Sequence, residues 1–489
     1  MMKRINLFVT ILVLPFLVGA QEFWAAGYTE SLDTTINGRM LIKATEDSVA
    51  FEPFDSPVQF ESTMAGVFDE EGDILFYTNG CRLYDGGHQV LAGGEVLNPG
   101  PIHDLVCDDY GYIAPRGATV VNFRTHPNLY YIIHLGVQDD ISHTVSYGPL
   151  YLTKVQHDPA SGSLTVLSAN EILMGGEVDP FDLIRHGNGN DWWLITNDFG
   201  ASTYHKILLT PYGLDQHEVQ DVGYDFPFPP CRGQRSLSAS PSGERLVRYS
   251  SRCGAQFLTF DRCSGELTVA GFSQLPYIIV GGGGSVFSDD SEFVYLTYWH
   301  QIMKVPFSNP PDTLRPAFRP PLSIGASFVH IYRAPHGELF IAPYASEPYL
   351  HTIPADDDNP DTAMVALEGL SLPYRMQRSI PHYPNMALGD LQNAPCDTLL
   401  NSTWQPYDEE RKDMLSVYPN PASDYITLDI ALEGEKMLTF INTIGQVVLR
   451  REVRAERLQL PLDIFPAGLY LVVLSQVGKQ MEVDRFIKQ

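Results

Sequence analysis

Acidic and histidine-containing segments are the parts of this chain whose residue types suggest chemistry. Asp356-Asp-Asp-Asn-Pro-Asp361 places several side-chain oxygens close together in the sequence, and a hard cation such as Ca²⁺ binds to such oxygens. The segment lacks the Asp-x-Asp-x-Asp-Gly spacing and the closing Glu of an EF-hand. It therefore predicts either a structural calcium site, with Asp356, Asp357, Asp358 and Asp361 as ligands, or a solvated acidic loop, which is the favoured interpretation.

Residues 185–193, Arg-His-Gly-Asn-Gly-Asn-Asp-Trp-Trp, form the densest polar cluster. His186 could bind a metal or carry protons, because an imidazole titrates near neutral pH. The favoured alternative is a tight turn, in which glycines take left-handed backbone conformations and Asn and Asp side chains bond to the backbone. Trp192 and Trp193 alternate across the following strand, so we expect one in the core and the other on a ligand surface or against a loop.

Sequence motifs for nucleophilic and zinc-dependent hydrolysis are absent. The sequence contains no Gly-x-Ser-x-Gly, Ser-x-x-Lys, His-Glu-x-x-His or Gly-x-x-x-x-Gly-Lys. Carboxylates are abundant enough for two of them to face each other, as a glycosidase requires, but the sequence does not say which two. Catalytic residues therefore stay unassigned, and no cofactor is expected apart from the candidate calcium.

A polar turn followed by an apolar run recurs along the chain, and it sets the expected fold. The copies begin at Asp69, His126, Gly187, Ser240, Ser288 and Ala334. Each copy predicts a hairpin turn and a buried strand, and the interval is that of one four-stranded blade with its loops. Little apolar periodicity of 3.6 residues is present, so helices should be few. The pattern predicts an all-β chain built as a β-propeller.

The two ends of this region favour seven blades over six. Residues 23–54 and 385–391 contain strand-like segments that the six turns leave over. Because a propeller is a closed ring, strands from both ends can share one blade and so remove the open edges. Residues 400–414 are polar without a period and are predicted to be a linker.

Charge and cysteine content restrict the partners and the compartment. The formal net charge of the whole chain is −27, and residues 21–414 taken alone carry about −28. A nucleic acid is therefore not an expected partner. Residues 1–20 combine Lys3 and Arg4, an apolar run and a small-residue site before Gln21, which predicts a signal peptide cleaved between Ala20 and Gln21. No further segment is apolar for long enough to span a membrane.

An even number of cysteines in an exported chain predicts three disulfides. The candidates are Cys81, Cys107, Cys231, Cys253, Cys263 and Cys396. Proximity in the sequence favours Cys81 with Cys107 and one pair among Cys231, Cys253 and Cys263. The sequence leaves the full connectivity open.

The C-terminal residues 415–489 alternate between apolar and polar positions and predict a small Ig-like antiparallel sandwich of about seven strands. The segment opens with Leu-Ser-Val-Tyr-Pro-Asn-Pro and contains Gly-Gln-Val and Ala-Gly-Leu-Tyr in the expected order. It resembles the type A C-terminal sorting domain of the type IX secretion system, and an adhesion module is the alternative. The resemblance implies sorting residues at Tyr418, Pro419, Asn420, Pro421, Gly445, Gly468, Tyr470 and Lys488.

A second resemblance covers most of residues 60–400. Leu75-Phe-Tyr-Thr-Asn-Gly-Cys81, Phe260-Asp-Arg-Cys-Ser-Gly-Glu266 and Pro395-Cys-Asp-Thr-Leu399 are similar to segments of secreted propeller-like proteins that end in the same sorting domain. This resemblance implies the fold and the export route, and it implies no particular activity.

These observations predict a signal peptide (1–20), a propeller (21–399), a linker (400–414) and a sorting domain (415–489). We expect a secreted or surface-exposed protein that crosses the periplasm, meets the type IX secretion translocon through residues 415–489, and binds a glycan, peptide or protein. The alternative is a secreted hydrolase or lyase with carboxylates in the central funnel of the propeller. A purely structural surface component is a third hypothesis.

Overall fold

The structure is a computed structural model of the whole chain, and the description concerns the residues whose placement it defines. These are residues 22–28, 37–45, 48–69, 72–139, 145–226, 231, 234–275, 281–321, 325–376, 378, 381–392, 394, 396, 415–431, 434, 436–442, 447–455, 457–462, 465–466, 468–476 and 479–488. The chain divides into two compact units, residues 1–401 and 402–489. The predicted signal peptide with Ala20 and Gln21, the predicted linker and Gly445 lie outside the described residues.

Seven antiparallel sheets make up the described part of the first unit. Two of them have three strands: β1 (Glu22–Gly27), β2 (Arg39–Ala44) and β3 (Val49–Pro53), then β4 (Ala65–Phe68), β5 (Ile74–Thr78) and β6 (Leu83–Asp85). Five have four strands: β7 (Ala118–Phe123), β8 (His126–Asp139), β9 (Val145–Asp158) and β10 (Ser163–Met174); β11 (Asp182–Arg185), β12 (Trp192–Asn197), β13 (Thr203–Thr210) and β14 (Gly213–Asp221); β15 (Arg235–Ala239), β16 (Arg245–Ser250), β17 (Gly254–Phe260) and β18 (Leu267–Ser273); β19 (Ser285–Phe287), β20 (Phe293–Tyr298), β21 (Gln301–Pro306) and β22 (Pro316–Phe318); and β23 (His330–Arg333), β24 (Leu339–Ala342), β25 (Glu347–Ile353) and β26 (Ala366–Met376). One short helix, α1 (Pro101–Val106), follows β6.

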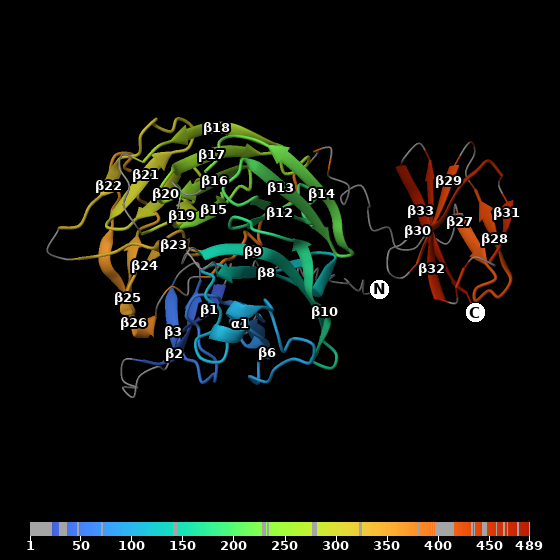
Figure 1. Cartoon of the computed structure of the whole chain (residues 1–489), viewed down its shortest axis with the longest axis horizontal. Coiled ribbons are helices and arrows are strands. Elements are labelled where there is room, and N and C mark those ends of the chain that lie inside the picture. The colour runs from blue at the N-terminus through green and yellow to red at the C-terminus, as the bar shows by residue number, and fades with distance from the viewer. Residues whose placement is uncertain are drawn as a thin grey trace, which may run out of the picture. The chain divides into compact units, whose positions relative to one another are not determined.

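The sheets are the blades of a seven-bladed propeller, as the sequence predicts. They follow one another around a common centre, with β15, β19 and β23 nearer to it than β18, β22 and β26 (Figure 1). The strands at the inner edge of neighbouring blades pack against each other, as β4 does on β7 and β15 does on β19. The predicted turns join the innermost strand of a blade to the next strand, for example between β15 and β16, where Gly243 has φ +72°.

The cores of the propeller lie between blades. Trp192 and Trp193 are both fully buried. Trp192 Nε1 donates to Asn122 O (2.9 Å) of one neighbouring blade, and Trp193 Nε1 donates to Arg262 O (3.0 Å), between β17 and β18 of the other. The expectation that only one of them could enter the core is wrong. Both faces of a blade are covered by other blades, so alternating residues are both inside.

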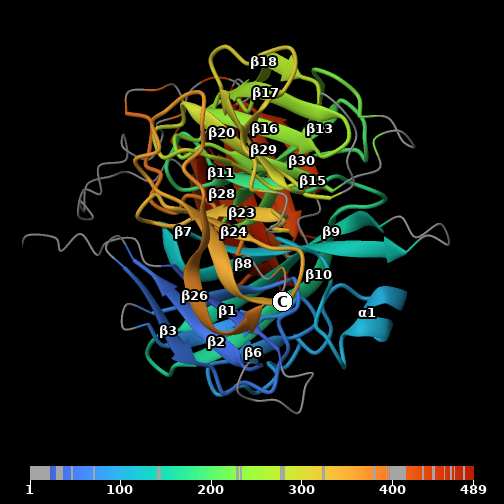
Figure 2. The ribbon, with the colours of Figure 1, turned by 90° about the vertical axis from the view of Figure 1, so that its left-hand side faces the viewer.

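The first sheet closes the ring. β1, β2 and β3 lie beside β26, the outer strand of the last blade (Figures 1 and 2). Trp24 of β1 packs edge-on against Tyr332 of β23 with ring centroids 5.4 Å apart. The first and last blades are therefore neighbours in the ring. The expectation that strands from both ends share one blade is wrong for the described residues, because the first sheet consists of β1, β2 and β3 and residues 385–391 form no strand.

Residues 381–392, here called the closing segment, lie at the inner side of β1 without forming a regular strand. The Tyr383 hydroxyl donates to Phe23 O of β1, and Thr119 Oγ1 of β7 donates to His382 O. His382 Nε2 lies 3.1 Å from Asp182 Oδ1 of β11. Contacts with strands of three different blades place the beginning of this segment at the axis of the propeller.

The rest of the closing segment contacts the blade of β11 again and the turn of one further blade, that of β15. Asn385 Nδ2 donates to Pro241 O (2.7 Å), and Arg185 Nη2 donates to Met386 O (3.2 Å). Beyond its end, Cys396 forms a disulfide with Cys263. A Cβ added to Gly187 would lie 2.4 Å from the Cys396 sulfur, so glycine at that position leaves room for the disulfide.

All six cysteines are paired in the structure. Cys81–Cys107 confirms the predicted local pair and holds α1, and Cys231–Cys253 confirms a pair within the predicted group of three. Cys263 instead bonds to Cys396, which is 133 residues away in the sequence.

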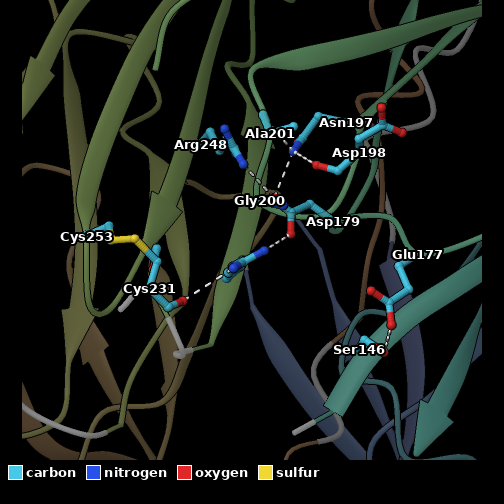
Figure 3. A network of polar contacts seen from close by, with 12 residues as sticks. Ser146, Glu177, Asp179, Asn197, Asp198, Gly200, Ala201, Cys231, Arg248 and Cys253 are labelled. Carbon is cyan, nitrogen blue, oxygen red and sulfur yellow. Dashed lines mark hydrogen bonds and ion pairs between the residues drawn. A yellow bond between two sulfur atoms is a disulfide. The ribbon is translucent and has the colours of Figure 1, made fainter. Parts of the chain in front are cut away.

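One buried network ties the blade of β11 to the blade of β15 (Figure 3). Asp179 forms ion pairs with Arg235 and Arg248, and Arg248 Nη2 lies 2.7 Å from Asp179 Oδ2. Asp179 Oδ2 also accepts a hydrogen bond from Asn197 Nδ2 (2.8 Å). Burial by itself would raise the pKa of the Asp179 carboxyl, but the charges and hydrogen bonds of Arg248 and Arg235 outweigh it and hold that pKa below its ordinary value. Asp179 is therefore ionised at neutral pH.

The second unit is a sandwich of seven described strands, as predicted. β27 (Leu415–Tyr418), β28 (Tyr425–Ile430) and β31 (Arg457–Pro461) form one sheet. β30 (Val447–Val453), β29 (Lys436–Asn442), β32 (Gly468–Gln476) and β33 (Lys479–Lys488) form the other. The apolar core between them includes Ile426, Leu428, Phe440 and Phe486.

Replacing Asp179 by Asn should lower the free energy of unfolding by roughly 3–5 kcal/mol, because two buried guanidinium groups lose their counter-ion. The exposed Asp358→Asn should change it by less than about 0.5 kcal/mol. Because the pKa of Asp179 is depressed in the folded state, its contribution is present above pH ~4 and is lost as the pH falls below that value. Urea unfolding from pH 7 to pH 3 tests both points, and equal losses in the two variants would contradict the assigned role of Asp179.

Replacing His382 by Ala should destabilise the propeller by about 1.5–3 kcal/mol, since the buried Asp182 carboxylate loses a hydrogen bond. Asn385→Ala removes a neutral hydrogen bond from the same segment and should cost about 1 kcal/mol. Urea unfolding measures the difference, and limited proteolysis of residues 381–392 should be faster in His382→Ala. Equal costs would show that Asp182 does not depend on His382.

Candidate functional site

A cavity of about 710 Å³ lies on the axis of the propeller. Its walls are the innermost strands of six blades, β1 and the closing segment. The lining combines aromatic rings, prolines, serines and a few charged side chains. They include Phe23, Phe68, Asp69, Arg116, Tyr130, Asp182, Arg185, Ser238, Ser240, Pro241, Ser285, Asp289, Tyr332, Arg333, Pro335, Pro381, Tyr383, Pro384 and Asn385.

The apolar part of the lining is built by residues of β1, β4 and the closing segment. Phe23 and Phe68 stack with ring centroids 4.9 Å apart. Tyr383 and Pro384 contribute to the same wall. Tyr332 also lines the cavity, and its buried hydroxyl has no hydrogen-bond partner among the described residues. Such a lining suits the body of a small organic ligand.

All three acidic residues in the described lining take part in specific contacts. Asp182 accepts hydrogen bonds from His382 and from the backbone N–H of Ala239 (2.7 Å), while Asp289 forms an ion pair with Arg333 at 2.6 Å. Asp69, at the turn after β4, accepts from the backbone N–H of Asp73 (2.7 Å).

The Asp182–His382 contact joins an ionised carboxylate to a neutral imidazole. Burial alone would raise the pKa of Asp182, but the hydrogen bond from His382, the charge of Arg116 and the hydrogen bond from the Ala239 N–H hold it below the ordinary value. Burial, helped by the charge of Arg116, lowers the pKa of His382 although Asp182 raises it. His382 therefore donates one hydrogen bond to Asp182 at neutral pH.

Arg116 brings a positive charge to the cavity. Its Nη1 donates to Ser238 Oγ (3.2 Å) of β15, although the strand that follows Arg116 is β7, two blades away. Burial, followed by the charges of Arg378 and Arg116, lowers the pKa of His330 to about 3, so this nearby histidine is neutral. Asp182 interacts with Arg116 through its charge, without an ion pair within 4.0 Å.

The structure does not gather the predicted calcium ligands. Asp356, Asp358 and Asp361 are exposed in the connection between β25 and β26. Asp357 is buried instead, 3.2 Å from Lys304 Nζ, and it accepts a hydrogen bond from the Tyr295 hydroxyl (3.0 Å). Within the described residues, no group of three or more His, Cys, Asp or Glu side chains is placed to hold a metal ion.

The cluster around His186 forms a turn, as the favoured interpretation predicted. His186 Nδ1 accepts from the Asn188 N–H (3.0 Å), and its Nε2 donates to Cys263 O (3.1 Å). Gly189 has φ +72°, and Asn188 Oδ1 accepts from the Asp191 N–H (3.0 Å). Both imidazole nitrogens are used in shaping the turn next to the Cys263–Cys396 disulfide.

The predicted sorting residues fall into two groups. Tyr418, Pro419, Asn420 and Pro421 are exposed in succession, beginning at the last residue of β27. Gly468 pairs with Lys488 across β32 and β33, and Lys488 also forms a bridge with Ala422, so these positions adjoin the end of the exposed run. Tyr470 is buried, stacks on Phe486 and donates a hydrogen bond to Pro466 O (2.8 Å), so it packs the core.

Sequence reasoning missed Arg116, Asp182 and His382 as neighbours in the cavity. Pro115-Arg116-Gly117 carries a turn signal, but an arginine in a turn is usually exposed. Of the closing segment, the repeat pattern singles out only residues 385–391, and His382 lies outside them. The contact between Asp182 and His382 joins residues 200 positions apart, and no local pattern encodes it.

Among curated proteins, none is significantly similar to this chain in sequence. Three solved structures illustrate the structural likenesses, all weak. A putative 6-phosphogluconolactonase from Bacteroides uniformis has 10% identity and a TM-score of 0.36, covering 90% of this chain and 99% of that chain. PorZ, a surface component of the type IX secretion system of Porphyromonas gingivalis, has 12% identity and a TM-score of 0.31, and the match covers 94% of this chain and 64% of PorZ. The Dos1 propeller has 10% identity and a TM-score of 0.39, and the match covers 68% of this chain and 80% of that chain.

Likenesses of this strength add nothing to the propeller architecture, which rests on the sheets themselves. The C-terminal unit gives a specific result. Residues 416–489 match the family described as the secretion system C-terminal sorting domain. The described residues also contain no helix that is long and apolar enough to span a membrane. The chain is a β-propeller that carries a C-terminal sorting domain of the type IX secretion system, which indicates export to the cell surface or the extracellular space.

Proposed function

We propose that this protein is an exported binding protein that holds its ligand in the axial cavity of the propeller. The cavity carries the proposal: about 710 Å³ lies within the roughly 300–1,000 Å³ of small-molecule sites. Aromatic and proline walls with a few polar groups are typical of such sites. A small glycan or a peptide segment fits this volume and chemistry.

The export route begins, in this proposal, with removal of residues 1–20 between Ala20 and Gln21. The type IX translocon then recognises residues 415–489, with the exposed Tyr418, Pro419, Asn420 and Pro421 as the first contact. Three disulfides suit this route, because disulfides form in an oxidising periplasm.

A carboxylate-dependent hydrolase or lyase is the alternative, and the cavity supports it less. That chemistry needs two carboxyl groups that act on one bond. In the described lining, Asp182 is held by His382 and Ala239, and Asp289 is paired with Arg333. The acidic side chains are therefore used mainly to stabilise the walls.

Deleting residues 415–489 should leave the protein in the periplasm, since the proposed export signal is lost. Cell fractionation of the native host measures the distribution. Fusing residues 415–489 to a periplasmic reporter should send the reporter to the surface or the medium. Surface display of the truncated protein would contradict the sorting role.

A glycan and peptide array probed with residues 21–489 should identify a ligand, and a cavity-filling variant should test where it binds. Ala387 lies exposed in the cavity lining, so Ala387→Trp should weaken binding roughly tenfold or more by occupying that space. The matched control Ala160→Trp lies in the exposed turn between β9 and β10 and should bind normally. Isothermal titration calorimetry measures the affinities, and unchanged binding in Ala387→Trp would place the ligand elsewhere.

A further inference from the structure

Arg116 has a backbone conformation that its residue type does not favour. Gly117 N donates to Ala114 O (3.0 Å), which closes a turn over Ala114-Pro115-Arg116-Gly117. Pro115 occupies the second position, and Arg116 occupies the third with φ +53°. A type II turn favours Gly or Asn at that third position, because a side chain there is strained. The strain persists at a residue that lines the axial cavity, and strained residues cluster at functional sites.

The polar groups around Arg116 hold its guanidinium in place. Ser238 Oγ, which accepts from Arg116, donates its own proton to Ser285 O (2.9 Å). Ser236 Oγ lies 2.7 Å from Ser285 Oγ, so the three buried hydroxyls form one row. The lone pairs of Ser238 are thereby directed toward Arg116, which fixes the direction of the cation.

The three arginines of the described lining differ in how their charge is compensated. Arg333 is paired with Asp289. Arg185 donates to the carbonyls of Gly189, Asn190 and Met386 and lies over the Trp192 ring at 4.1 Å. Arg116 contacts a neutral hydroxyl, and the nearest acid, Asp182, is already held by His382 and Ala239.

This arrangement leaves a positive charge beside an apolar cavity. A guanidinium presents several N–H groups in a plane, and it binds carboxylates through two parallel hydrogen bonds. The ionised Asp182 lies near enough to influence Arg116, so a ligand with two negative charges would be repelled more than one with a single charge. The hydroxyl of Tyr332, which has no partner among the described residues, is a further polar group in the lining.

Building on the proposed function, we propose that the axial cavity selects ligands that carry a single carboxylate, and that Arg116 binds this carboxylate. The aromatic and proline walls contact the body of the ligand, while Arg116 fixes its acidic end. Arg116 is thus the specificity-determining residue of the cavity.

The test compares acids with their neutral amides in the full chain. The probes are glucuronate with glucuronamide, N-acetylphenylalanine with its amide, and glucose 6-phosphate as a dianion. Calorimetric titration of the wild-type protein should show an acid preference of roughly tenfold or more over the amide, with weaker binding of the phosphate. Equal affinity for acid and amide, or no binding of either acid, would overturn the proposal.

Arg116→Gly separates binding from folding, because glycine suits φ +53° and the turn should be as stable as before or more so. This variant should lose the acid preference without a lower melting temperature, and Arg116→Lys should keep part of it. Glu368→Gly is the matched control, since Glu368 also has a left-handed φ of +55° but is exposed on β26. It should retain the preference of the wild type.

An acid preference that survives in Arg116→Gly would also overturn the proposal. If a ligand found on the array binds Ala387→Trp more weakly than the wild type but binds Arg116→Gly as tightly as the wild type, the cavity is a binding site that does not require an anion. The proposed function would then stand, and the role of Arg116 would be rejected.

Discussion

The need to close a ring is the constraint on which the rest of this propeller depends. Each blade is covered only by its two neighbours, so the first and last blades must meet to remove their exposed edges. Here the first sheet has three strands, and the closing segment lies along β1 without a regular ladder. Side-chain contacts replace the missing strand: Tyr383 bonds to β1, His382 to β11 and Asn385 to the turn after β15.

Ring closure also sets the chemistry of the cavity. The closing segment is one wall of the cavity, and its His382 occupies the Asp182 carboxylate. Arg116, whose carbonyl oxygen lies 3.1 Å from His382 Nδ1, is thereby left beside a carboxylate that already has its partners. The contact that joins the ends of the propeller therefore determines which charge remains available to a ligand. Any movement of residues 381–392 would change the shape and the charge of the site together.

Local patterns predicted the parts of the structure that local physics controls. Residues 187–191 and 240–243 form hairpin turns because Gly189 and Gly243 tolerate left-handed backbone and the side chains of Asn188 and Ser240 bond to the backbone. Cys81 and Cys107 are close in the sequence and form a disulfide. The expectations for Trp192 and Trp193 failed where packing between blades decides, because a propeller buries both faces of a strand.

In the acidic segment of residues 356–361, too, the local pattern predicted the residue types, whereas packing decided which of them are buried. Its composition suggests a cation, but which carboxylates face inward depends on the fold. Lys304, far away in the sequence, supplies the charge that Asp357 meets. Sequence reasoning identified the acidic residues and could not identify their partner.

The sequence by itself determined the all-β repeat, the C-terminal sorting domain that indicates export, and the even set of six cysteines. Those features depend on residue order over short stretches, where turn chemistry and strand alternation act. The tertiary structure alone decided that Arg116, Asp182, Ser238 and His382 meet at the axis. They meet there because ring closure brings together residues from separate blades, and the burial of their charges depends on that closure.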